Sequence, residues 1–139
     1  MICEANGGKL LEPKSQKITD EVRQLVNGQL NSNQVWIGIN DIKEEGKYIY
    51  ASDGSSVTWL NWNNKKSRGH PDNKENEDCI VMEFDWNGTW NSISCDNEMK
   101  MEFICESTTE KTPQNSALTF GINMILIFAE MCFLHYIFM

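Results

Sequence analysis

The chain has 139 residues, which leaves room for one domain and little more. It carries 20 acidic against 12 basic residues, a formal net charge of −8, and the basic residues are scattered. Nucleic acids and anionic membrane surfaces both attract clustered Lys and Arg, so neither is an expected partner. An acidic surface suits a protein that binds cations.

The residue patterns, taken in chain order, predict an α+β domain. Residues 15–30 have a helical period with Ser15 as the cap. The apolar face of this helix consists of Ile18, Val22, Leu25 and Val26. Short strands separated by turn residues follow at 35–39, 48–50, 79–84, 89–92 and 101–105. Residues 61–78 form a long polar loop, and a loop of that length in a compact domain is usually functional.

Five cysteines stand at positions 3, 79, 95, 105 and 132. The first four lie in the polar part of the chain and predict two disulfides, in any of three pairings. Disulfides indicate an oxidising compartment. The opening residues Met1-Ile2-Cys3 have neither a charged nor an apolar leader, so we interpret the chain as an N-terminally truncated piece or an incomplete gene model.

The segment Asp72–Asp78 has oxygen-bearing side chains at six of its seven positions. Calcium takes six to eight hard oxygen ligands, and such a density supplies them. A solvated acidic loop is the alternative interpretation of this stretch taken alone.

Several short motifs come in a fixed order along the chain. They are Trp36-Ile37-Gly38-Ile39-Asn40-Asp41, Glu45-Gly46, Asn61-Trp62, Glu77-Asp78-Cys79, Gly88-Thr89-Trp90-Asn91, Cys95 and Ile104-Cys105-Glu106. Together they resemble the C-type lectin-like family across residues 3–106, nearest to collectins and dendritic-cell mannose receptors. The resemblance implies short antiparallel strands, one or two flanking helices, a long calcium-binding loop region and two disulfides. It also implies that residues 1–106 are one domain without the family's first strand and first helix.

The resemblance further implies the cysteine pairing and two calcium sites. It pairs Cys3 with Cys105 and Cys79 with Cys95. The auxiliary calcium site matches Asp41, Glu45, Asn73, Glu77 and Asp78. The second site, which would also hold the sugar, matches His70, Asp72, Glu77, Asn91 and Ser92.

Two positions of the sugar site depart from the family pattern. His70 stands where the family has Glu or Gln, and imidazole is a poor ligand for calcium. Ser92 stands where the family has Asp. We therefore predict a calcium-dependent carbohydrate-binding module with a partly degenerate sugar site, with glycans or glycoproteins as partners and no catalysis. A calcium-independent protein-recognition domain of the same fold is the alternative, and a hydrolase is the hypothesis from another class.

Two further features concern the surface and the core. Asn87-Gly88-Thr89 is an N-glycosylation sequon in a predicted turn. Trp36, Trp62 and Trp90 are predicted core residues, whereas Trp86, beside the turn, is the candidate for a sugar-stacking surface.

The C-terminal part differs in composition. Residues 107–116 are a polar linker, and residues 117–139 are mostly apolar. About 23 helical residues span roughly 35 Å, so we predict a membrane helix, although Glu130 near its middle would cost about 3 kcal/mol if charged. A cleaved glycolipid-anchor signal and translated non-coding sequence are the alternatives. We therefore expect an extracellular or cell-surface protein, anchored at its C-terminus.

Overall fold

The computed structural model describes residues 2–64, 71, 76–96 and 101–107. Its elements, in chain order, are α1 (Ile2–Ala5), β1 (Gly8–Leu10), α2 (Gln16–Leu25), β2 (Gln34–Asn40), β3 (Ile49–Tyr50), β4 (Cys79–Glu83), β5 (Thr89–Ile93), β6 (Glu102–Phe103) and β7 (Cys105–Ser107). This arrangement of helices and mainly antiparallel strands confirms the predicted α+β class.

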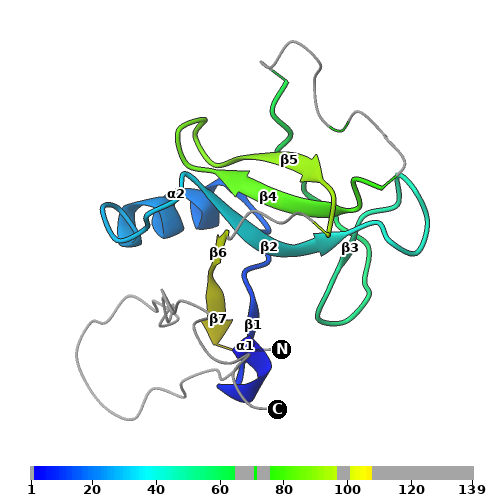
Figure 1. The fold of residues 1–139 in the computed structure, drawn as a ribbon, viewed down its shortest axis with the longest axis horizontal. Coiled ribbons are helices and arrows are strands. Elements are labelled where there is room, and N and C mark those ends of the chain that lie inside the picture. The colour runs from blue at the N-terminus through cyan, green and yellow to red at the C-terminus, as the bar shows by residue number, and fades with distance from the viewer. Residues whose placement is uncertain (1, 65–70, 72–75, 97–100, 108–139) are drawn as a thin grey trace, which may run out of the picture.

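The strands form two sheets (Figure 1). In the larger sheet the order is β3-β2-β4-β5, and β6 pairs in parallel with β2. The smaller sheet pairs β1 with β7, so the beginning and the end of the described chain lie side by side. Helix α2 lies beside the end of the larger sheet where β4 turns into β5 (Figure 1).

The core lies between α2 and the larger sheet. Val35, Ile37 and Ile39 alternate along β2 and are buried, as the strand period predicts. Trp90 of β5 is fully buried and meets the half-buried rings of Trp59 and Trp62 edge-on, with centroids 5.2 and 5.8 Å away. The remaining core side chains are Leu11, Val22, Val26, Tyr50, Ile80, Met82 and Ile104.

Helix α2 begins as predicted and ends earlier. The Ser15 hydroxyl accepts a hydrogen bond from the Ile18 amide at 3.3 Å, which caps the first turn. The helix stops at Leu25 instead of residue 30, and Gly28 in the following turn has a φ of +73°. Leu25, predicted on the apolar face of the helix, is 39% exposed. It lies at the edge of the helical face on which Val22 is buried.

The predicted strand 101–105 is two strands in different sheets. β6 pairs with β2, the intervening Ile104 is buried in the core, and β7 pairs with β1. Ile104 also accepts a hydrogen bond from the Leu11 amide at 2.8 Å, which fixes the crossing point. The elements α1 and β1 were not predicted from periodicity because each is only three or four residues long.

Trp36 is not a core residue, contrary to the prediction. It alternates with Val35 and Ile37 on β2 and therefore faces away from the main core. Its half-buried side chain lines a cavity of about 550 Å³ together with Leu10 and Phe103.

Both disulfides implied by the family resemblance are present. Cys3 of α1 is bonded to Cys105 of β7, with Cα atoms 5.5 Å apart. Cys79 at the start of β4 is bonded to Cys95, just beyond β5, with Cα atoms 5.0 Å apart. Among the described residues no helix is long and apolar enough to cross a membrane. The predicted membrane helix, 117–139, lies outside them and stays a prediction.

Candidate functional site

Asp41 and Asp78 meet at one end of the larger sheet. Asp41 follows the last residue of β2, and Asp78 precedes the first residue of β4. Because these strands are antiparallel, with Asn40 opposite Cys79, the two aspartates lie next to each other. The Asp41 amide donates a hydrogen bond to the Asp78 carbonyl at 3.1 Å. The structure thus brings together two predicted calcium ligands that are far apart in sequence.

Asp41 is held rigidly in a tight loop. Its side chain is 2% exposed, and its Oδ2 accepts a hydrogen bond from the Gly46 amide at 2.9 Å. Its carbonyl accepts a second one from the Glu44 amide at 3.0 Å. Glu45, the next predicted ligand, lies exposed in the same loop. The other carboxylate oxygen of Asp41, Oδ1, is buried and accepts no hydrogen bond from any described residue.

The strand β5 brings two predicted sugar-site residues to the same half of the sheet. Asn91 lies opposite Val81 and Ser92 opposite Ile80, two and one residues, respectively, before the Cys79–Ile93 pair that ends the ladder. Both side chains are buried. The Asn91 Oδ1 atom is also buried and accepts no hydrogen bond from the described part of the chain.

The two unpaired oxygens have a chemistry in common. Five side-chain polar atoms of the described residues are buried without a hydrogen-bond partner. Three of them, in Tyr50, Thr89 and Trp90, are hydroxyl or indole groups that can donate a proton. Only Asp41 Oδ1 and Asn91 Oδ1 are pure acceptors. An unpaired buried acceptor is costly, and a hard cation is a natural partner for such an oxygen.

The remaining predicted ligands divide into two groups. Glu77 and Asp78 are half-buried at the start of β4, beside Asp41. His70, Asp72 and Asn73 lie outside the described residues. Within the parts of the chain that the structure describes, no group of three or more His, Cys, Asp or Glu side chains forms a complete metal cluster. The described residues therefore supply only part of each predicted ligand set.

A charged cluster at the smaller sheet was not predicted from the sequence. Glu12 is 2% exposed and accepts hydrogen bonds from Lys9 and from the Ser52 amide, the latter at 2.9 Å. Lys9 also pairs with Glu106 at 3.3 Å. Burial raises the pKa of the Glu106 carboxyl above its ordinary value, and the nearby Lys9 only partly opposes that rise. Burial lowers the pKa of Lys9, but Glu12 and Glu106 outweigh this and raise it overall. The cluster joins β1 to β7, and its Lys9 and Glu12 also line the cavity beside Trp36. Because its charged groups pair with one another, we regard it as structural.

The predicted sequon lies at the opposite end of β4 and β5 from Asp78. Asn87 is exposed in the turn between these strands and has a φ of +63°. Trp86 beside it is 44% exposed, in line with its expected place at the surface.

Comparison with known proteins decides the family. The model of the lectin C-type domain matches residues 1–107. The chain belongs to this family. It is 34% identical over 105 residues to a mannose-binding protein from Gallus gallus, a match that covers 76% of this chain and 37% of that protein. It is 40% identical over 77 residues to an alpha-N-acetylgalactosamine-specific lectin from Patiria pectinifera, covering 54% of this chain and 42% of that one. The chain therefore spans about two fifths of the length of these relatives.

A solved structure agrees with this assignment. The carbohydrate-recognition domain of the mouse scavenger receptor C-type lectin superimposes with a TM-score of 0.64 and 28% identity, covering 81% of this chain and 79% of that one. A C-type lectin domain is a binding module and generally not an enzyme. Its two disulfides indicate an extracellular protein.

Proposed function

We propose that this C-type lectin domain binds sugars through calcium at the end of the larger sheet where Asp41 and Asp78 meet. The observation that carries the proposal is the buried Oδ1 of Asp41, which has no hydrogen-bond partner among the described residues and is held beside Asp78 by a backbone hydrogen bond. A buried carboxylate oxygen without a donor is destabilising unless a cation approaches it. The sugar-binding names of two relatives, one for mannose and one for N-acetylgalactosamine, support the substrate class.

Two ligand sets would hold the ions. The auxiliary set is Asp41, Glu45, Asn73, Glu77 and Asp78. The sugar-site set is His70, Asp72, Glu77, Asn91 and Ser92. The carboxylates in both sets are acceptors, and the Asn91 amide offers one acceptor oxygen and two donor hydrogens. When bound, calcium supplies an electrophilic anchor for two vicinal sugar hydroxyls.

The protein's own side chains would orient that sugar. Asn91 is fixed on β5, where its amide can present Oδ1 to the ion and its N–H group to a hydroxyl. Glu77 can accept a hydrogen bond from the neighbouring hydroxyl. Because amides donate and carboxylates accept, their arrangement selects the stereochemistry of the hydroxyl pair.

The sugar site is expected to be weak. It has two carboxylates, Asp72 and Glu77, where the usual pattern supplies three or more. Ser92 is 3% exposed, so its neutral hydroxyl stands in the interior where the family pattern has a carboxylate. Fewer anionic ligands lower calcium affinity.

Calcium titration by calorimetry tests the ion site. Glu45→Ala and Asp78→Ala should each weaken calcium binding by about tenfold or more, since each removes an anionic ligand. Glu21→Ala is the matched control, because it removes an exposed carboxylate on α2, whose side chain is 61% exposed. Unchanged affinity in both Glu45→Ala and Asp78→Ala would remove the basis of the proposal.

Retention on galactose and mannose columns, with and without chelator, tests the sugar site. The double variant His70→Gln with Ser92→Asp should raise calcium affinity and sugar retention together. Equal retention in chelator would rule out the calcium mechanism. A double variant that gains calcium but no sugar would favour the alternative, a protein-recognition domain of the same fold.

A further inference from the structure

The turn between β4 and β5 holds the side chain of Asn87 in one position. Gly88 donates its amide to the Glu83 carbonyl at 2.8 Å and is buried against α2, with a φ of +73°. A Cβ atom at this position would lie 2.2 Å from Thr19 Cγ2, so only glycine fits. Asn87 has a φ of +63°, which asparagine tolerates better than most residues. The Asn-Gly pair therefore fixes the turn against α2.

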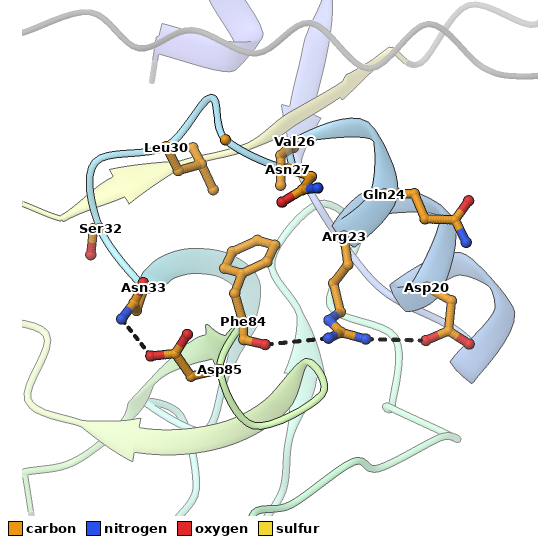
Figure 2. Close-up of a pocket in the computed structure, with 11 residues that line it drawn as sticks. Asp20, Arg23, Gln24, Val26, Asn27, Leu30, Ser32, Asn33, Phe84 and Asp85 are labelled. Carbon is orange, nitrogen blue, oxygen red and sulfur yellow. Dashed lines mark hydrogen bonds and ion pairs between the residues drawn. The ribbon is translucent and has the colours of Figure 1, made fainter.

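The Asn87 side chain contacts a residue that lines a pocket. Arg23 of α2 donates to Asn87 Oδ1 at 2.7 Å and to the Phe84 carbonyl at 3.4 Å. Arg23 and Phe84 line a cavity of about 560 Å³, which we call the hairpin pocket. Figure 2 shows the Phe84 ring projecting into this pocket, between Leu30 and Arg23.

The amide nitrogen of Asn87 is the free end of that side chain. Its oxygen is engaged by Arg23, whereas Nδ2 donates no hydrogen bond to any described residue. Asn87 is also the first residue of the sequon Asn87-Gly88-Thr89, and the two disulfides belong to a chain that folds in an oxidising compartment. The nitrogen that would carry a sugar thus belongs to a side chain bonded to Arg23, and Arg23 lines a pocket with an aromatic wall.

We propose that Asn87 carries an N-linked glycan whose first N-acetylglucosamine packs in the hairpin pocket against Phe84 and stabilises the fold. The glycan comes from a lipid-pyrophosphate-linked oligosaccharide. Asn87 Nδ2 forms a bond to C1 of its first sugar and loses a proton, while the bond from C1 to the pyrophosphate breaks and the lipid pyrophosphate leaves. Oδ1 is unchanged by this transfer, so its hydrogen bond to Arg23 can persist in the glycosylated protein.

The pocket offers both kinds of contact that such a sugar needs. The apolar face of a pyranose ring packs well on an aromatic ring, and Phe84 is half-buried with its ring toward the pocket. Asp20 of α2 and Asp85 of the turn line opposite sides of the pocket (Figure 2), and their carboxylate oxygens can accept hydrogen bonds from sugar hydroxyls and from the acetamido N–H. The glycan leaves the proposed calcium end free, because β4 and β5 separate the turn from Asp78.

Thr89 supplies a matched pair of variants. Its hydroxyl is buried without a partner among the described residues, so Thr89→Val removes the sequon without removing a hydrogen bond. Such a replacement is neutral or slightly stabilising in itself. Thr89→Ser keeps the sequon.

Glycan occupancy at Asn87 is measured on the full chain, produced behind a secretion leader in eukaryotic cells. Mass spectrometry before and after peptide-N-glycosidase treatment gives the fraction of Asn87 that carries a glycan. Occupancy is expected in the natural protein and in Thr89→Ser, and its absence from the natural protein overturns the proposal.

Thermal unfolding in chelator tests the docking separately from calcium binding. The glycosylated protein, and the form trimmed to one N-acetylglucosamine, should each unfold about 4 °C or more above Thr89→Val. No difference would overturn the docking. Phe84→Leu keeps an apolar side chain in the pocket and removes the aromatic wall, so the same comparison made in that background should show a smaller difference. An equal difference in both backgrounds would overturn the contact with Phe84.

Discussion

The two disulfides are expected to contribute unequally to this protein. Cys3–Cys105 should contribute more to stability, and Cys79–Cys95 should contribute more to calcium affinity. Cys3–Cys105 closes a separation of 102 residues, whereas Cys79–Cys95 closes one of 16. Closing a loop restricts the unfolded chain, and the restriction grows with the logarithm of loop length. The longer loop contributes about 4.7 kcal/mol and the shorter about 3.1 kcal/mol at 25 °C.

Replacing each pair by alanine therefore separates the two contributions. The variant without Cys3 and Cys105 should lose about 1.6 kcal/mol more of the free energy of unfolding than the variant without Cys79 and Cys95. Both Cys3 and Cys105 are buried, so the cavity left by their sulfurs enlarges the gap. With an m-value of about 1.5 kcal/mol/M, the urea midpoints of the two variants should differ by about 1 M or more.

Calcium affinity should follow the reverse order. Cys79 directly follows Asp78, so its disulfide fixes the end of the sheet where the proposed ligands lie. Cys3–Cys105 ties α1 to β7 at the other sheet. Urea unfolding in chelator and calorimetric calcium titration of the folded variants measure the two effects. The reasoning is refuted if the variant without Cys79 and Cys95 is the less stable one, or if it binds calcium as tightly as the natural protein.

Two further predictions concern packing and charge. Val22→Ala should lower the free energy of unfolding by about 2 kcal/mol, because Val22 is fully buried against the sheet. Leu25→Ala should lower it clearly less, because Leu25 is 39% exposed. Equal losses in urea unfolding would contradict the described helix face. Glu106→Gln should raise stability at neutral pH, because burial raises the pKa of that carboxyl and so disfavours its charged form in the fold. The gain should vanish below the ordinary pKa of about 4.5, where the carboxyl is protonated in both the folded and the unfolded state, and a gain that does not change with pH would contradict this origin.

Much of the framework was predictable from the sequence by itself. The alternation of Val35, Ile37 and Ile39 marks β2, and the Ser15 cap marks the start of α2, because both signals depend on residues close together in the chain. The ordered motifs, taken with the family resemblance, gave the fold, the disulfide pairing and the candidate ligands. The end of α2 was predicted wrongly, at residue 30 instead of Leu25. A glycine with positive φ such as Gly28 follows many helices, but its position does not fix the residue at which the helix ends.

The tertiary structure decided what depends on contacts between distant segments. Strand pairing puts Asp41 beside Asp78 and leaves the Oδ1 atom of Asp41 buried without a donor among the described residues. Trp36 lies outside the core because the second face of β2 borders a cavity that Leu10 and Phe103 also line, which the period of a single strand does not reveal. The link from Arg23 to Asn87 spans 64 residues and exists only because α2 packs on the β4–β5 turn. Local patterns determine which residues can form an element, and long-range packing determines which side chains that element places together.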